Sequence, residues 1–213
     1  MTNDIALRRL AKMPIIAILR GISVSEVDAV SDTLVQAGVT CMEVTLNTSG
    51  WQECISRLHR RHGSNILLGA GTVLHPEQVA EVQKYGGRII ISPNMNTDVI
   101  KATKELDLIS APGCFTPTEC FAALHAGADI LKLFPAEALG LPFIKAISAV
   151  LPGGVRICPT GGVGVSNIAG FVAAGVIAVG VGSSLYKKGK LIEELHQAAN
   201  KLVAQAKVGQ LQL

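Results

Sequence analysis

One unit is repeated along the whole chain, and this repetition limits the possible folds more than any other feature. Each unit begins with a short run rich in Ile, Val and Leu, continues through small or turn-forming residues, and ends in an amphipathic stretch. The pattern indicates strands that alternate with helices, which predicts a parallel sheet with right-handed crossovers. Eight strands are expected, at residues 15–20, 41–46, 67–72, 88–92, 108–111, 130–134, 155–159 and 178–182.

Eight such units predict an α/β fold, a (β/α)₈ TIM barrel that forms a single domain over residues 1–213. An extra N-terminal helix is expected at 4–12, and a closing helix at 191–207. The competing architecture is an eight-stranded doubly wound sheet, because both folds show the same alternation. Either fold has material for a large core, since 49% of the residues are hydrophobic and 16% are charged, as expected for strands buried on both faces.

Two polar clusters indicate where helices begin. Thr116 is followed by Pro117 and then by Glu119, which is the pattern of a capping box at a helix N-terminus. Ser25 has Asp28 three residues later, a similar spacing. We therefore expect one helix to begin just after Thr116 and another just after Ser25.

Composition argues against several classes of protein. No apolar stretch reaches the ~18 residues of a membrane-spanning helix, and the first residues lack the apolar centre of a signal peptide, so a cytoplasmic protein without a membrane partner is expected. The five cysteines are scattered, which suits buried, reduced thiols. A net charge of +3, with 4% aromatic residues and no long basic run, gives no reason to expect a nucleic-acid partner.

Three charged residues interrupt otherwise apolar strands: Arg20, Glu43 and Lys132. In a barrel, polar residues near the carboxyl ends of the strands line the active site. Strand alternation places Lys132 on the same face as Ile130 and Phe134, where desolvation would lower the pKa of its amine and make it a nucleophile. The alternative is a lysine that extends outward between helices.

Glu43 requires a partner or a function, because an unpaired carboxylate inside an apolar strand is costly. It belongs to the second expected strand and Lys132 to the sixth, and opposite strands of a barrel contribute to the same interior layers. The two side chains are therefore expected to converge, giving a nucleophilic amine with a carboxyl group that moves protons. A purely structural buried ion pair is the alternative.

Glycine-rich segments follow the last two expected strands. Thr160, Gly161 and Gly162 follow the seventh strand, and Gly182 and Ser183 end the eighth. In barrels these positions commonly bind phosphate through backbone N–H groups. The five residues are therefore candidate phosphate ligands, with the Ser183 hydroxyl as a further donor.

With these residues in place, the chain resembles the 2-keto-3-deoxy-6-phosphogluconate (KDPG) and 2-keto-3-deoxy-6-phosphogalactonate (KDPGal) aldolases, class I enzymes that act through pyruvate. The resemblance covers nearly the whole chain, because its motifs occur in order at the ends of successive strands. The motifs are IAILRG (16–21), MEVTLN (42–47), GAGTV (69–73), ISPN (91–94), PGC (112–114), LKLFPAE (131–137), PTGGV (159–163) and GVGSSLY (180–186).

The resemblance implies that Lys132 forms the Schiff base and that Glu43 is the general acid/base. It implies that Thr72 contacts the keto-acid end of the substrate, and that the phosphate is held by Gly162, Gly182 and Ser183. The implied reaction splits the bond between C3 and C4, giving pyruvate and glyceraldehyde 3-phosphate, with no cofactor. A homotrimer is also implied.

The resemblance does not select one branch of the family. Gluconate-type enzymes carry an arginine where this chain has Asn47, whereas here Arg20 ends the first strand. We expect Arg20 to bind the substrate carboxylate in place of that arginine. The C4 epimer stays open, and so does 4-hydroxy-2-oxoglutarate, a substrate without phosphate.

Two other functions compete with the aldolase. A thiamine-phosphate-synthase-like transferase would share the glycine-rich ends but would not need Lys132, and a non-catalytic phosphosugar-binding barrel would leave both Lys132 and Glu43 without a role. A metal-dependent aldolase needs ligands at strand ends, where His75 is the only histidine, so no metal site is expected.

Overall fold

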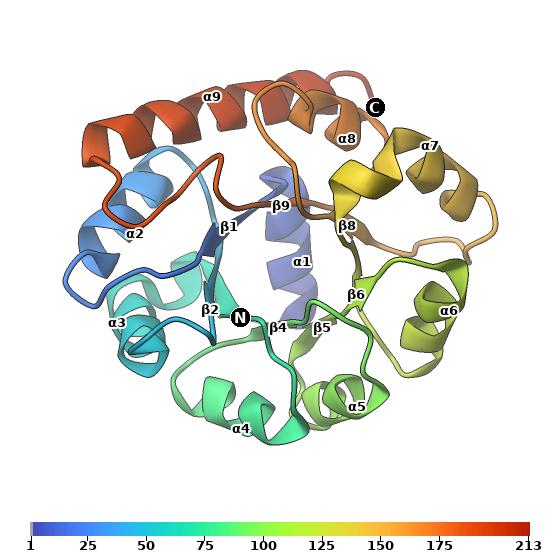
Figure 1. Cartoon of the computed structure of the whole chain (residues 1–213), viewed down its shortest axis with the longest axis horizontal. Coiled ribbons are helices and arrows are strands. Elements are labelled where there is room, and N and C mark those ends of the chain that lie inside the picture. The colour runs from blue at the N-terminus through green and yellow to red at the C-terminus, as the bar shows by residue number, and fades with distance from the viewer. Residues whose placement is uncertain (1) are drawn as a thin grey trace.

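The computed structural model describes residues 2–213 and shows strands that alternate with helices (Figure 1). The helices are α1 (Asn3–Lys12), α2 (Val27–Gln36), α3 (Trp51–His62), α4 (Pro76–Lys84), α5 (Thr97–Glu105), α6 (Pro117–His125), α7 (Ala136–Ser148), α8 (Ile168–Ala173) and α9 (Ile192–Gln210), with a short 3₁₀ helix at Gly63–Asn65. The strands are β1 (Ile15–Leu19), β2 (Cys41–Thr45), β3 (Leu67–Gly71), β4 (Ile89–Ile91), β5 (Ile109–Ala111), β6 (Gly113–Cys114), β7 (Leu131–Leu133), β8 (Ile157–Pro159) and β9 (Val179–Val181).

The strands form a curled parallel sheet of six, in the order β5-β4-β3-β2-β1-β9, and a parallel sheet of three, β6-β7-β8. Every expected strand is present, and the doubly wound order is not found among the described residues. Hydrogen bonds also join the two sheets. The Ile130 N–H donates to the Ser110 carbonyl at 3.1 Å on one side, and the Ile177 N–H donates to the Ile157 carbonyl at 3.0 Å on the other.

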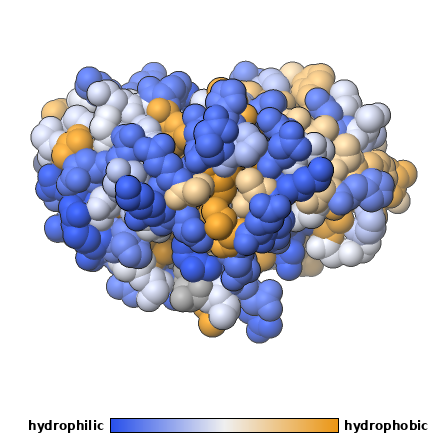
Figure 2. Space-filling view, turned by 90° about the horizontal axis from the view of Figure 1, so that it is seen from below, coloured by the Kyte–Doolittle hydropathy of each residue, from blue (hydrophilic) through white to orange (hydrophobic). Residues whose placement is uncertain are grey.

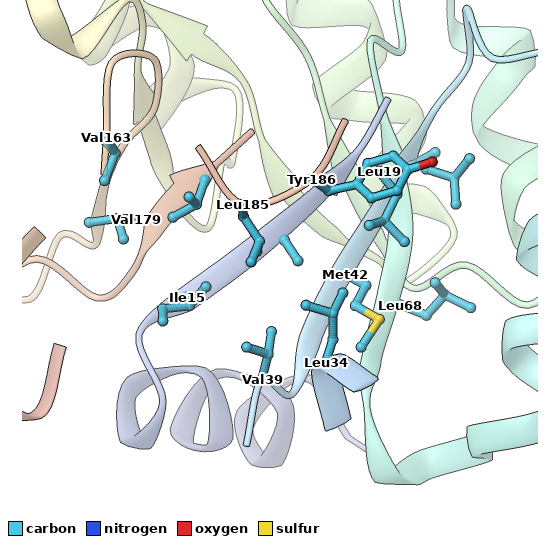
Figure 3. Close-up of a cluster of buried hydrophobic side chains, with 14 of the residues drawn as sticks. Ile15, Leu19, Leu34, Val39, Met42, Leu68, Val163, Val179, Leu185 and Tyr186 are labelled. Atoms are coloured by element: carbon cyan, nitrogen blue, oxygen red, sulfur yellow. The ribbon is translucent and has the colours of Figure 1, made fainter. Parts of the chain in front are cut away.

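Alternation along the strands creates two hydrophobic clusters. An outer cluster lies between the strands and the helices, and Figure 3 shows part of it, including Ile15, Met42 and Val179. An inner cluster includes one or more residues from each expected strand, together with Ala6, Leu7 and Leu10 of α1. Helix α1, which lies behind the strands in Figure 1, therefore packs against the amino ends of the strands and leaves their carboxyl ends open.

Both expected helix starts are found, but only one has the expected cap. Thr116 accepts from the Glu119 N–H and the Glu119 carboxylate accepts from the Thr116 N–H, which completes the capping box of α6. The helix expected just after Ser25 is also present, since α2 begins at Val27, but Ser25 does not cap it. Asp28 instead pairs with Arg57 of α3, because the neighbouring helix offers a charged partner that the sequence spacing did not reveal.

The surface is mostly hydrophilic on the face covered by α4 and α5. Figure 2 shows hydrophobic residues there only in small groups among charged and polar ones. Among the described residues, no helix combines the length and the apolar character needed to cross a membrane.

Candidate active site

A cavity of about 540 Å³ opens at the carboxyl ends of the strands. Parallel strands bring their carboxyl ends to one edge, so residues far apart in the sequence meet there. The lining contains every site residue expected from the sequence: Arg20, Glu43, Thr72, Lys132, Thr160, Gly161, Gly162, Gly182 and Ser183.

Lys132 and Glu43 are the buried charged groups of this cavity. Lys132 lies on β7 and is 7% exposed, while Glu43 lies on β2 and is 2% exposed. Burial lowers the pKa of the Lys132 amine, although the Glu43 carboxylate acts in the opposite direction. Burial raises the pKa of Glu43 to about 6, although the charges of Lys132 and Arg20 oppose the shift. The amine is thus closer to its nucleophilic form at neutral pH, and the carboxyl group is able to exchange protons.

No direct ion pair joins Lys132 to Glu43 in the part of the chain that the structure describes. One carboxylate oxygen, Oε2 of Glu43, is buried without a hydrogen-bond partner among those residues. The Lys132 Nζ lies 4.9 Å from the centre of the Phe134 ring, which holds the amine at the cavity wall. The structural ion pair is therefore not formed, and both groups are left free to meet a substrate.

Gly71 gives the Glu43 carboxyl group its space. It ends β3 beside β2, and a Cβ added there would lie 2.5 Å from Oε1 of Glu43. A side chain at this position would therefore displace the carboxyl group from where it now lies. The sequence motif GAGTV contains Gly71, but only the packing shows that this glycine leaves space for the Glu43 carboxyl group.

Thr72 follows Gly71 and has a backbone φ of 60°, in the left-handed region that a β-branched residue rarely adopts. Such strain persists only where the surrounding structure imposes it, and it is frequent in ligand sites. The side chain lines the cavity next to the buried pair.

Arg20 extends from the end of β1 into the mouth of the cavity and is exposed. Its guanidinium Nη1 donates to Oδ1 of Asn47 at 3.2 Å. Arg20 lines the same cavity as Glu43 and Lys132. Asn47, where gluconate-type enzymes carry arginine, thus contacts the arginine that this chain carries on the neighbouring strand.

The loops after β8 and β9 line the cavity with backbone N–H groups. Those of Gly162, Val163, Ser183 and Ser184 donate no hydrogen bond to any other described group. Gly162 has φ +71°, and a Cβ there would meet Glu137 at 2.5 Å. Unpaired N–H groups gathered in a concave loop form a ready site for an anion such as phosphate.

Phe134 shares the face of Lys132, as strand alternation predicted, and its ring lies beside the amine. Four lining residues near the loops after β8 and β9 were not expected from the sequence: Ser184, Tyr186, Lys187 and Lys188. Ser184 and Tyr186 lie within a quoted motif, but the sequence offered no signal of what their side chains contact. The two lysines are adjacent in the sequence, where such a short basic pair gives no signal of a ligand site.

The sequence and the structure were compared with those of known proteins. The family model described as KDPG and KHG aldolase, where KHG is the 4-hydroxy-2-oxoglutarate substrate, matches residues 6–202. A 2-dehydro-3-deoxy-6-phosphogalactonate aldolase of Escherichia coli K12 is 41% identical over 188 residues, covering 88% of this chain and 92% of that protein. A 2-dehydro-3-deoxy-phosphogluconate aldolase of Treponema pallidum is 34% identical over 168 residues, covering 79% and 78%. A solved structure described as native KDPGal superposes with a TM-score of 0.91 and 40% identity, covering 95% of this chain and 98% of the other.

These findings identify the chain as an aldolase, and therefore as a lyase. More particularly, the chain belongs to the KDPG and KHG aldolase family. Membership in this family excludes the thiamine-phosphate-synthase-like transferase and the non-catalytic barrel as its function.

Proposed function

We propose that the protein reversibly cleaves 2-keto-3-deoxy-6-phosphogalactonate to pyruvate and glyceraldehyde 3-phosphate through a Schiff base on Lys132. The observation that carries this proposal is a buried amine, with a lowered pKa, in the same cavity as a buried carboxyl group and a cluster of unpaired N–H groups. Identity is higher with the galactonate relative than with the gluconate relative, at 41% against 34%, which favours the galactonate epimer.

In the proposed reaction, the Lys132 amine attacks C2 of the keto acid, and loss of water gives an iminium ion. Glu43 accepts the proton of the C4 hydroxyl, the bond between C3 and C4 breaks, and its electron pair moves into the iminium to form an enamine. Glyceraldehyde 3-phosphate leaves. Protonation at C3 and hydrolysis of the imine then release pyruvate and restore the amine.

The binding roles are assigned from the lining of the cavity. Thr72 contacts the keto-acid end, and Arg20, whose guanidinium is held by Asn47, binds the carboxylate. The phosphate binds to the loops after β8 and β9, at Thr160, Gly161, Gly162, Gly182 and Ser183. A substrate without phosphate, such as 4-hydroxy-2-oxoglutarate, would leave those N–H groups without a partner. We therefore expect it to be cleaved with a lower kcat/KM.

We also propose that residues 1–213 form one domain in which the two sheets close into a single (β/α)₈ barrel. The hydrogen bonds on both sides of the three-stranded sheet support closure, and so does an inner cluster with residues from every expected strand. A homotrimer is proposed from the family resemblance. The cytoplasmic location stays a prediction from the sequence.

Reduction with borohydride in the presence of pyruvate tests the mechanism. We expect a stable adduct on Lys132, because hydride reduces the imine to a secondary amine that is not hydrolysed. Intact mass measures the adduct, and peptide mapping locates it. Omission of pyruvate is the control, and an adduct on any other lysine would show that the nucleophile is assigned wrongly.

Replacement of Arg20 tests the carboxylate assignment. Arg20→Ala is expected to weaken pyruvate trapping and cleavage by about 1.5–3 kcal/mol, the usual range for a hydrogen bond to a charged group, and Arg20→Lys by less. Pyruvate has a carboxylate but no phosphate, so its half-saturating concentration in the trapping reaction isolates this role. Asn47→Ala, which removes only the partner of Arg20, is expected to have a smaller effect. Normal pyruvate trapping by Arg20→Ala, with weakened binding of phosphorylated substrate alone, would make Arg20 a phosphate ligand instead.

A further inference from the structure

The loop that follows β9 is attached to the strand-end loops on both sides of it. On one side, the Ser184 hydroxyl donates to the Val163 carbonyl at 2.6 Å, which joins it to the loop after β8. On the other side, the Tyr186 hydroxyl donates to Oε1 of Glu26, 160 residues away, in the segment between β1 and α2. Ser183, which has an exposed side chain and an N–H group that donates to no other described residue, directly precedes these two attachments.

The contact between Tyr186 and Glu26 is built into the protein rather than formed at its surface. Tyr186 is 3% exposed, and Figure 3 shows its hydroxyl pointing away from Leu185. Burial, reinforced by the hydrogen bond to Glu26, raises the pKa of Tyr186 well above its usual range, so the hydroxyl stays protonated and donates.

Glu26 is itself held in position. Its second carboxylate oxygen, Oε2, accepts from the Ser23 hydroxyl at 2.8 Å, and Ser23 in turn contacts Ser25 at 3.0 Å. Both oxygens of the carboxylate therefore have partners, one on its own loop and one on the loop after β9. A chain of hydrogen bonds thus connects the segment just beyond Arg20 with the segment just beyond Ser183.

We infer that Tyr186 and Glu26 are positioning residues for the phosphate of the substrate. They hold the loop of residues 182–186 so that its N–H groups and the Ser183 hydroxyl already face the cavity before the phosphate arrives. An ordered loop binds more tightly than a free one, because the entropy of ordering is not lost on binding. This inference rests on the proposed function, since it assumes that the substrate carries a phosphate.

Tyr186→Phe is the test, because it keeps the buried ring and removes only the hydroxyl. We expect KM for the phosphorylated substrate to rise about tenfold, as for loss of one hydrogen bond to a charged group, while kcat changes less than twofold. The kcat/KM for 4-hydroxy-2-oxoglutarate and the trapping of pyruvate on Lys132 should not change, since neither uses the phosphate site.

The chain offers a matched control and a second variant. Tyr85→Phe removes the hydroxyl of a tyrosine that packs against Trp51 outside this cavity, and should leave every value unchanged. Glu26→Gln retains an oxygen that accepts from the Tyr186 hydroxyl. It should therefore raise KM for the phosphorylated substrate less than Glu26→Ala does. The double variant Tyr186→Phe with Glu26→Ala should be no worse than Glu26→Ala alone, because the two residues act through one contact.

The outcomes separate this inference from the proposed function. An equal loss for phosphorylated and unphosphorylated substrates, or an unchanged KM in Tyr186→Phe, would overturn the positioning role. If the wild-type protein traps no pyruvate on Lys132, the Schiff-base proposal itself is wrong, whatever Tyr186 does.

Discussion

Lys132→Ala is expected to abolish cleavage while the protein stays folded, because alanine leaves no amine to form the imine. The electron pair of the bond between C3 and C4 would then have no acceptor, since no other group in the proposed reaction forms an iminium. Lys132 is buried on an apolar strand, where a desolvated cation does not stabilise the fold. Its removal should therefore leave the protein folded. The rate of glyceraldehyde 3-phosphate release measures activity, and thermal unfolding measures the fold.

Two further lysine variants sharpen this test. Lys132→Arg retains a positive charge but cannot form a Schiff base, so it should be as inactive as Lys132→Ala. Lys145→Ala removes an exposed lysine of α7 and should have normal activity. Substantial turnover by either Lys132 variant would mean that the reaction does not pass through an imine at this residue.

Glu43→Gln is expected to slow turnover by about 10²–10⁴, the usual range for loss of a general acid/base. Glutamine has nearly the same shape and fills the space left by Gly71, so the fold should be preserved. Because the amide cannot accept the proton of the C4 hydroxyl, kcat should fall more than KM rises. The matched control is Glu53→Gln on the exposed side of α3, and a Glu43→Gln rate close to wild type would make Glu43 structural.

The same residue predicts the acid limb of the pH profile. Burial raises the pKa of Glu43 to about 6, so its carboxylate form is present above that pH and is lost as the pH falls through it. Since cleavage needs the carboxylate as base, kcat/KM of the wild-type protein should decline below about pH 6. Glu43→Gln should lack this decline. If the decline persists in that variant, another group is responsible for it.

Much of the fold could be predicted from local pattern. Apolar runs and helical periodicity located all the expected strands within a few residues, since periodicity reflects burial that each segment carries in its own sequence. Thr116 likewise specified its helix start, because both partners of the capping box lie within four residues. Ser25 also marked a helix start, but it forms no cap, and Asp28 pairs instead with Arg57 on another helix.

For the site, the sequence by itself supplied the residue types: a lysine and a glutamate in apolar strands, and glycines after the last two strands. Strand number and alternation were enough to expect Lys132 and Glu43 in one cavity, since opposite strands share interior layers. Only the tertiary structure decided that the two groups form no ion pair, that Gly71 makes room for the carboxyl group, and that Tyr186 reaches Glu26 across 160 residues. The physical reason is that charges in an apolar run are visible locally, whereas the distances between side chains are set by how distant segments pack.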